Sequence, residues 1–193
     1  MISCISCENI HLFGSAFHSQ FQLRYRAFIE RQDYDVRIYR GMEYDQYDTP
    51  ASHYLVYHTR DGRALGVSRL TPTTQGCMLQ DLWPGMVEDK ALLSAADVWE
   101  GTRYCIDKDV EPALRTRIIH EMAAAYLEFG LQAGIRKIIG DADLHLSQRV
   151  RKARHRHGVS GAGHHYRRPQ DPGGRHTRRP RSAAQCPRQD WHR

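Results

Sequence analysis

The sequence contains no apolar run of about 18 residues or more, the length that a helix needs to cross a membrane, so we expect no membrane span. Its first residues, from Met1 to Glu8, also lack the basic segment and the long apolar stretch that mark a secretory signal. Both absences favour a protein that works in the cytoplasm.

Cysteine is scarce and irregularly spaced. There are five cysteines, and the pair Cys4-x-x-Cys7 has no second pair that would complete a zinc site. In the cytoplasm thiols of this kind stay reduced. We therefore expect free cysteines and no bound metal.

Positive charge is distributed unevenly along the 193 residues, whose net charge is +6. Residues 144–193 carry 13 Lys and Arg against two Asp and Glu, a net charge of +11, whereas the preceding residues carry 15 against 20, a net charge of −5. The sequence predicts a folded core over residues 1–150 and a basic low-complexity tail over residues 151–193.

The tail is rich in Arg, His and Pro and has almost no periodic apolar residues, so it cannot bury enough surface to fold by itself. We interpret it either as a disordered segment or as the wrong reading frame of a GC-rich gene (a frameshift). A nucleic-acid-binding arm is less favoured, because only Tyr166 and Trp191 could stack on bases and no known binding module surrounds them.

Apolar periodicity predicts a mixed α/β (α+β) sandwich, with helices flanking a twisted sheet. Gly101, inside a strand, indicates a bulge that would turn Glu100 and Arg103 toward one cleft. Asp61-Gly62 favours a hairpin with a two-residue connection. The expected elements are strands near 1–6, 53–58, 63–70, 98–106 and 136–140, and helices over 12–31 and from Pro112 to Gly134.

Helical spacing places Arg24, Phe28 and Arg31 on one face of the first helix. The second helix is expected to have an apolar stripe of Leu114, Ile118, Met122, Tyr126 and Phe129. Residues 75–97 are predicted as loop and short helix, residues 140–143 as a turn, and residues 144–151 as the start of a helix.

An acidic stretch follows the first predicted helix and places Glu43, Asp45 and Asp48 within six residues. Carboxylates this close repel one another unless water, a cation or an ammonium group of a substrate lies between them. A solvated turn and one wall of a binding site are both consistent with this pattern taken alone.

Several motifs in a fixed order resemble the acyl-homoserine-lactone synthases, the autoinducer synthases of bacterial quorum sensing, over residues 1–150. They are Leu23-Arg24-x-x-x-Phe28-x-x-Arg31, Tyr34-Asp35, Met42-Glu43-x-Asp45-x-x-Asp48, Gly66-x-x-Arg69-Leu70-x-Pro72-Thr73-Thr74 and Trp99-Glu100-x-x-Arg103. The resemblance implies a fold related to the N-acetyltransferases, with a V-shaped cleft. It also implies acyl transfer from acyl-carrier protein or acyl-CoA to the amine of S-adenosylmethionine, followed by lactone closure and release of methylthioadenosine. S-adenosylmethionine would be a substrate, and no cofactor would be bound permanently.

The chemistry of that substrate suggests a role for each predicted site residue. A sulfonium amino acid has two cationic centres and one carboxylate, so acids suit the former and arginine the latter. Its amine must lose a proton, which requires a general base, and aromatic faces attract a sulfonium. We assign Asp45 and Asp48 to the cationic centres; Arg24 and Arg103 to the carboxylate and to ordering the acidic stretch; Arg69 to the sheet rim beside them; Phe28 and Tyr34 to the aromatic face; and Glu100, with Glu43 as second choice, to the base.

Two departures from the family pattern stand out. Tyr34 occupies a position where the family usually has Trp, and the resemblance ends near residue 150, before the helix and strands that would complete the acyl-chain pocket. We therefore expect an incomplete acyl pocket, an exposed sheet edge, poor solubility and little activity.

Two alternatives remain. An ordinary acyl-CoA N-acetyltransferase would need a Gly-rich turn that opens a helix, whereas Arg63 to Ser68 is predicted to lie on a strand. The other alternative is an inactive, truncated synthase whose basic tail binds nucleic acid.

Overall fold

The structure is a computed structural model that describes residues 1–34 and 36–140. The sequence-based expectations for Asp35, for a turn at 140–143, for the start of a helix at 144–151 and for the basic tail lie outside the described residues. The expectations for the acyl pocket that this later part of the chain would complete also lie outside them.

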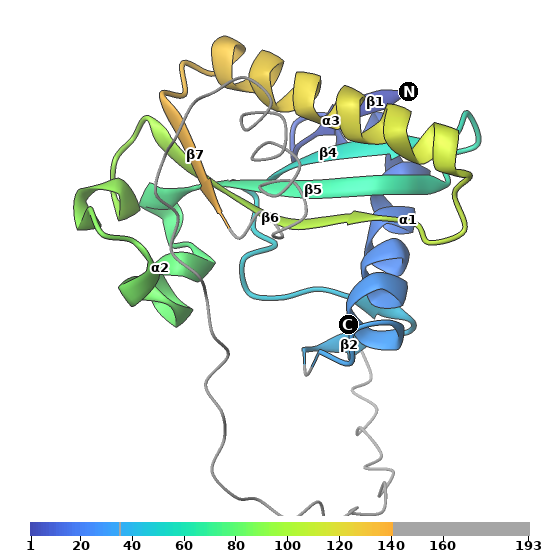
Figure 1. The fold of residues 1–193 in the computed structure, drawn as a ribbon, viewed down its shortest axis with the longest axis horizontal. Coiled ribbons are helices and arrows are strands. Elements are labelled where there is room, and N and C mark those ends of the chain that lie inside the picture. Colours follow the sequence, from blue (N-terminus) through green and yellow to red (C-terminus); the bar gives the residue numbers. More distant parts are fainter. Residues whose placement is uncertain (35, 141–193) are drawn as a thin grey trace, which may run out of the picture.

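In the part of the chain that the structure describes, a five-stranded sheet forms the centre, in the order β1-β4-β5-β6-β7 (Figure 1). The first four strands pair antiparallel, while β7 runs parallel to β6. The mixed sheet predicted from the sequence is therefore confirmed. The strands are β1 (Ile2–Ile5), β4 (His53–His58), β5 (Ala64–Pro72), β6 (Val98–Ile106) and β7 (Lys137–Gly140).

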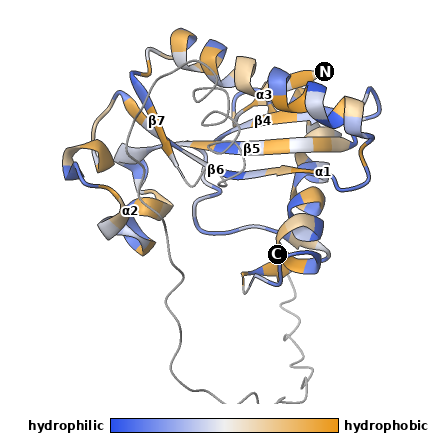
Figure 2. Cartoon of the chain, in the orientation of Figure 1, coloured by the Kyte–Doolittle hydropathy of each residue, from blue (hydrophilic) through white to orange (hydrophobic). Residues whose placement is uncertain are grey.

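Two long helices cover opposite faces of this sheet: α1 (Gly14–Arg24) and α3 (Pro112–Gln132). Alternation along β4 supplies both layers, since Tyr54 and Val56 pack with the α1 cluster while Leu55 and Tyr57 pack with the α3 cluster. Figure 2 shows apolar residues along the strands between these helices. The apolar stripe predicted for α3 is confirmed; it consists of Leu114, Ile118, Met122, Tyr126 and Phe129.

The first predicted helix is confirmed, but it changes type partway. A 3-10 turn (Ile10–Leu12) precedes α1, and a π-helix (Tyr25–Glu30) follows it. The wider π-turn holds more residues than an α-turn, so a residue seven positions after Arg24 no longer returns to the same face. Arg24 and Phe28 are buried, whereas Arg31 is exposed, and the prediction that Arg31 shares their face is wrong.

The β4–β5 hairpin forms where it was predicted, but its connection is longer than two residues. Thr59 and Arg63 pair through their backbones, with the Thr59 N–H to Arg63 carbonyl distance at 3.0 Å, so three residues lie between them. The Thr59 hydroxyl also accepts from the Arg63 N–H at 3.0 Å. Gly62 has φ of +87°, the left-handed conformation that a three-residue hairpin loop requires at this place.

The predicted bulge in β6 exists, but it lies at Arg103 and not at Gly101. Val67 pairs with Cys105 while Arg69 pairs with Thr102, so β6 contains one extra residue, and Arg103 has φ of +56°. The bulge turns Arg103 to the same cavity as Glu100, which confirms the predicted consequence.

Gly101 is instead required for packing against α3. A Cβ atom at this position would lie 3.0 Å from the Tyr126 hydroxyl and 3.3 Å from its ring. We expect Gly101→Ala to lower the free energy of unfolding by about 1–3 kcal/mol through overpacking, measured by urea denaturation. Because Tyr126→Phe removes the nearest atom, the same substitution should cost less in that background. An equal cost in both backgrounds would contradict this explanation.

Short elements on the sheet face opposite α3 lead to the site. A two-residue hairpin, β2 (Ile38–Tyr39) and β3 (Met42–Glu43), carries the start of the acidic stretch. The region between β5 and β6 was predicted as loop and short helix, and this is confirmed. It contains the helix α2 (Met78–Leu82) and three 3-10 turns, Thr73–Gln75, Pro84–Met86 and Lys90–Leu93.

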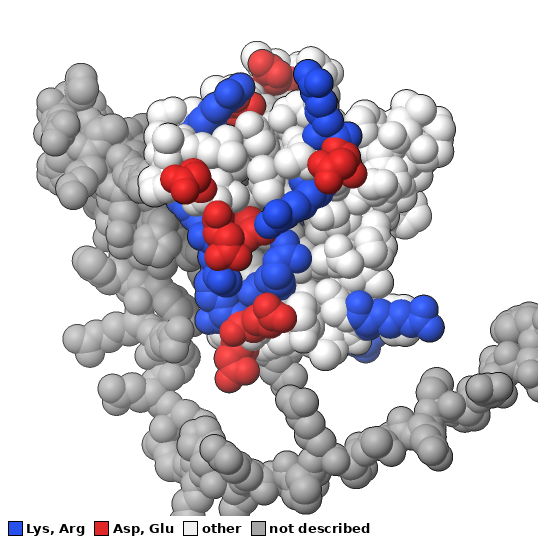
Figure 3. Space-filling model, turned by 90° about the vertical axis from the view of Figure 1, so that its right-hand side faces the viewer, with Lys and Arg blue, Asp and Glu red and all other residues white. Residues whose placement is uncertain are grey.

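The end of the molecule with the β4–β5 hairpin and the β6–α3 loop faces the viewer in Figure 3, where basic and acidic side chains are intermixed. Asp107 accepts there from Arg26 at 3.0 Å and from Arg63 at 3.4 Å. Cys4, Cys7, Cys77 and Cys105 are free thiols. No helix in the described part of the chain is both long and apolar enough to cross a membrane.

Candidate active site

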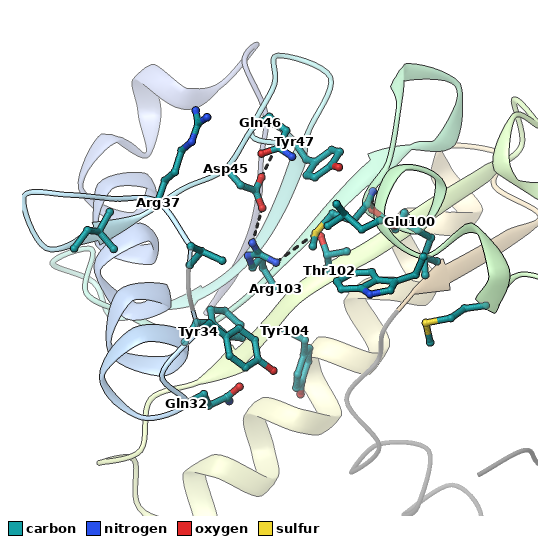
Figure 4. A pocket seen from close by; sticks show the side chains of 18 of the residues that line it. Gln32, Tyr34, Arg37, Asp45, Gln46, Tyr47, Glu100, Thr102, Arg103 and Tyr104 are labelled. Carbon is teal, nitrogen blue, oxygen red and sulfur yellow. Dashed lines mark hydrogen bonds and ion pairs between the residues drawn. The ribbon is translucent and has the colours of Figure 1, made fainter. Parts of the chain in front are cut away.

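A cavity of about 1380 Å³ lies between α2, the end of the π-helix, the acidic stretch and the bulged part of β6. Figure 4 shows side chains from all of these segments pointing into it. Five predicted site residues line this cavity: Phe28, Tyr34, Asp45, Glu100 and Arg103.

The acidic stretch is not a solvated turn. Its three carboxylates pair with three arginines from α1, β5 and β6: Arg24, Arg69 and Arg103. No side chain in this charge network is more than 9% exposed. Three negative and three positive groups balance, which is the condition for burying so many charges.

Asp48 lies at the inner end of the charge network. Arg24 donates to both of its carboxylate oxygens at 2.8 Å, a bidentate pair, and the Tyr54 hydroxyl adds a third bond at 2.8 Å. Burial alone would raise the pKa of this carboxyl, but the hydrogen bonds and charge of Arg24 and the charge of Arg69 lower the pKa well below its usual range. Asp48 is therefore an ionised structural centre of the site.

Asp45 lies at the outer end and reaches the cavity. Arg69 Nη1 lies 2.5 Å from its Oδ1. Arg103 Nη2 lies 2.6 Å from its Oδ2, a contact that is drawn in Figure 4. The Asp45 N–H in turn donates to Asp48 Oδ2 at 2.8 Å. The loop is thus fixed by its own carboxylates and presents Asp45 to whatever occupies the cavity.

Glu43 joins the helix to the bulged strand and has no exposed surface. Arg24 Nε donates to its Oε2 at 2.6 Å, and Arg103 Nε donates to its Oε1 at 3.1 Å. Both oxygens are therefore bound by guanidinium groups, which makes Glu43 an anchor for Arg103.

Glu100 faces the cavity from β6 and is held by backbone amides. The N–H groups of Met78 and Leu79, at the start of α2, donate to its two oxygens at 3.0 and 2.6 Å. Burial raises the pKa of Glu100 above the ordinary value of 4.5, and it outweighs the amides, which favour the ionised form. A fixed carboxylate with a raised pKa suits proton abstraction.

An aromatic pair forms the wall nearest to the π-helix. Phe28 and Tyr34 stack with their ring centroids 5.8 Å apart, and the Arg103 guanidinium lies over Phe28 at 5.6 Å from its centroid. Tyr34 is 49% exposed, so one edge of this wall is open to solvent. The ring faces could attract a cationic ligand.

The remaining predicted site residues, Arg24, Glu43, Asp48 and Arg69, lie behind the cavity wall and hold Asp45 and Arg103 in place. Sequence reasoning missed Met78, Leu79 and Tyr54, which bind the predicted carboxylates. The alternation in β6 could have indicated Thr102, which lies two residues after Glu100 and lines the cavity.

The model of the autoinducer synthase family matches residues 10–167. The acyl-homoserine-lactone synthase of Vibrio anguillarum is 35% identical over 103 residues, which are 51% of this chain and 53% of that protein. The isovaleryl-homoserine lactone synthase of Bradyrhizobium diazoefficiens is 31% identical over 140 residues, 72% of this chain and 62% of that protein.

Solved structures agree with these matches. The CoA-dependent acyl-homoserine lactone synthase BjaI, solved with SAM and isopentyl-CoA, has a TM-score of 0.67 and 29% identity, over 79% of this chain and 71% of that chain. TofI, in a ternary complex with an inhibitor and MTA, has a TM-score of 0.63 and 26% identity, over 79% of this chain and 77% of that chain.

The chain spans about half to two thirds of the length of the first curated relatives that it matches: the match covers 53% of one of these proteins and 65% of another. The family model nevertheless covers most of this sequence and includes every residue of the site described above. The chain belongs to the autoinducer synthase family.

Proposed function

We propose that the protein transfers an acyl group from a thioester to the amine of S-adenosylmethionine and then closes a homoserine lactone. The observation that carries this proposal is a single cavity bearing the amide-held Glu100 carboxylate, the Asp45–Arg103 pair and an aromatic wall. These groups match a base, sites for charged ends of an amino acid and a face for a sulfonium.

In the first step Glu100 accepts a proton from the substrate ammonium group. The free amine attacks the thioester carbonyl, the tetrahedral intermediate collapses, and the thiolate leaves and takes up a proton. Glu100 is preferred over Glu43, because Glu100 lines the cavity, whereas Glu43 lies behind the cavity wall and pairs with two guanidinium groups. Orientation by two N–H donors leaves the remaining lone pairs of Glu100 for the proton.

In the second step an oxygen of the homoserine carboxylate attacks the γ-carbon that carries the sulfonium. The carbon–sulfur bond breaks, and methylthioadenosine leaves with its electron pair. The protein contributes positioning: Arg103 suits the carboxylate, Asp45 suits a cationic centre, and the Phe28–Tyr34 pair suits the sulfonium.

Arg24, Asp48 and Arg69 act as positioning residues in this proposal. The surrounding chain leaves at most 7% of each side chain exposed. Asp48 and Arg69 contact Asp45, which lines the cavity, and Arg24 contacts Asp48. Their contribution is a rigid charge arrangement that needs no rearrangement during the reaction.

The acyl donor is either acyl-CoA or acyl-carrier protein. BjaI was solved with isopentyl-CoA, which supports a CoA thioester. We infer a cytoplasmic location, where both donors and S-adenosylmethionine occur.

The deciding experiment measures methylthioadenosine release from S-adenosylmethionine, with acyl-CoA and acyl-carrier protein compared as donors. Release that depends on a donor supports the proposal and identifies that donor. If the full chain binds S-adenosylmethionine but releases nothing, while a version with residues after 150 in the alternative reading frame is active, the loss belongs to the tail. Absence of S-adenosylmethionine binding would contradict the proposal itself.

The raised pKa of Glu100 predicts the pH dependence. A general base works only when deprotonated, so kcat/KM should fall as the pH drops through a value above the ordinary 4.5 of a Glu carboxyl. The measurement is a pH profile of methylthioadenosine release at low substrate concentration. An acid limb at or below the ordinary value would contradict this environment for Glu100.

Two alternatives have their own tests. An N-acetyltransferase would acetylate amines without releasing methylthioadenosine. A non-catalytic protein whose basic tail binds nucleic acid would lose DNA binding when residues 152–193 are removed, with a steep salt dependence beforehand. We do not favour nucleic acid as a partner, because only Tyr166 and Trp191 of the tail could stack on bases and no known binding module surrounds them.

A further inference from the structure

Two buried guanidinium groups of the site point at a sulfur atom. Arg69 Nη2 and Arg103 Nη1 each lie 3.3 Å from Sδ of Met78. Their side chains are 0% and 9% exposed, and each arginine also binds a carboxylate oxygen of Asp45. A thioether is a weak hydrogen-bond acceptor. The convergence point of two cations is therefore filled by one of the poorest acceptors available to a protein.

The Met78 side chain can leave this place without disturbing the base. Methionine is unbranched and adapts its rotamers easily. Its link to Glu100 is through the backbone N–H, at 3.0 Å, and not through the side chain. Met78 lines the cavity but is only 7% exposed, so a bound molecule must displace its side chain to reach the two guanidinium groups.

We propose that the Met78 thioether is a placeholder for the α-carboxylate of the amino-acid substrate, which displaces it and takes the donors of Arg69 and Arg103. This inference rests on the proposed function and specifies how its substrate is recognised. An ionised carboxylate accepts short, strong bonds from guanidinium groups, whereas a thioether is only a weak acceptor. The exchange therefore favours the substrate.

The position of Glu100 supports a carboxylate of an amino acid over other anions. In an α-amino acid the carboxylate and the amine are attached to the same carbon. Since Glu100 is bound to the backbone of Met78 itself, a carboxylate at the Met78 sulfur would place the adjacent ammonium group near the base. The two added positive centres of the substrate would also offset the added carboxylate within the balanced charge network.

The test compares S-adenosylmethionine with methylthioadenosine, which shares the adenosine and the sulfur but lacks the amino acid. Met78→Gln introduces a stronger acceptor of similar size that competes with the carboxylate, so the Kd for S-adenosylmethionine should rise about tenfold. Met78→Leu removes the acceptor and leaves two buried N–H groups unpaired in the free protein, so the same Kd should fall severalfold. The Kd for methylthioadenosine should change by less than about twofold in both. Calorimetric titration of the full chain gives all of these values.

Met86→Gln is the matched control, because Met86 lines the same cavity but is 54% exposed, so an amide there stays hydrated. Thermal unfolding checks that each variant folds. The placeholder role would be wrong if a Met78 variant shifted the Kd for S-adenosylmethionine and the Kd for methylthioadenosine equally. It would also be wrong if Met78→Gln and Met78→Leu weakened the binding of S-adenosylmethionine equally. Either result would leave the proposed function intact. If the parent protein binds neither ligand, both proposals fail.

Discussion

Glu100→Gln is expected to lower kcat for methylthioadenosine release by about 10²- to 10⁴-fold, the usual contribution of a positioned general base. The amide cannot accept the proton from the substrate ammonium group. The substitution should leave the affinity for S-adenosylmethionine largely unchanged, because Glu100 is assigned to proton transfer and not to substrate binding. Calorimetric titration and a steady-state assay on the same preparation separate the two effects.

The substitution carries a structural risk that needs a control. Both Glu100 oxygens accept from N–H groups of α2, whereas a glutamine amide keeps only one acceptor oxygen and would turn its NH₂ donor toward the second N–H. Glu88→Gln, at an exposed position, is the matched variant and should keep full activity. Activity that persists in Glu100→Gln but collapses in Glu43→Gln would transfer the role of base to Glu43.

Asp48→Asn is expected to lower the free energy of unfolding by about 3–5 kcal/mol, because it leaves three buried guanidinium groups with only two carboxylates, Glu43 and Asp45. Arg24 is 0% exposed and donates two bonds to Asp48, so water cannot replace the lost charge. The measurement is urea denaturation at about pH 7. Asp61→Asn, at an exposed position in the β4–β5 loop, should change stability by less than about 0.5 kcal/mol.

The pH dependence gives Asp48→Asn a second signature. The pKa of Asp48 is lowered in the folded protein, so its ionised form stabilises the fold above the unfolded pKa, and this contribution is lost as the pH falls toward the folded pKa. The parent should therefore lose more stability between about pH 5 and pH 2 than the Asn variant does. If the free energies of unfolding of the parent and the Asn variant fall in parallel over this range, the protonation of Asp48 is not what destabilises the parent.

Much of the fold followed from local patterns. The stripe from Leu114 to Phe129 predicts α3, Gly134 ends it with φ of +65°, and Asp61-Gly62 marks the hairpin. The site residues were recognised as a group through the resemblance of their motifs to those of the synthase family, whereas the helices and strands followed from local sequence patterns. What these patterns report is composition and periodicity within single elements.

The division of labour within the site could not be predicted, since it depends on pairing between distant segments. Asp45 and Asp48 are chemically alike and three residues apart. One reaches the cavity and the other is buried against Arg24, because the loop turns between them. The bulge was assigned to Gly101, yet Arg103 adopts the left-handed conformation, held by Glu43 and Asp45 from outside its own strand.

The charge network also has a consequence for the order of folding. It joins α1, the acidic stretch, β5 and β6, and the bond between Arg103 and Glu43 spans 60 residues of chain. Closing such long loops is entropically costly, and stripping water from six charged groups gains nothing until the partners have met. The apolar layers around α1 and α3 can close without these charges. Catalytic competence is therefore expected to emerge as the last event of folding, after the hydrophobic scaffold is already in place.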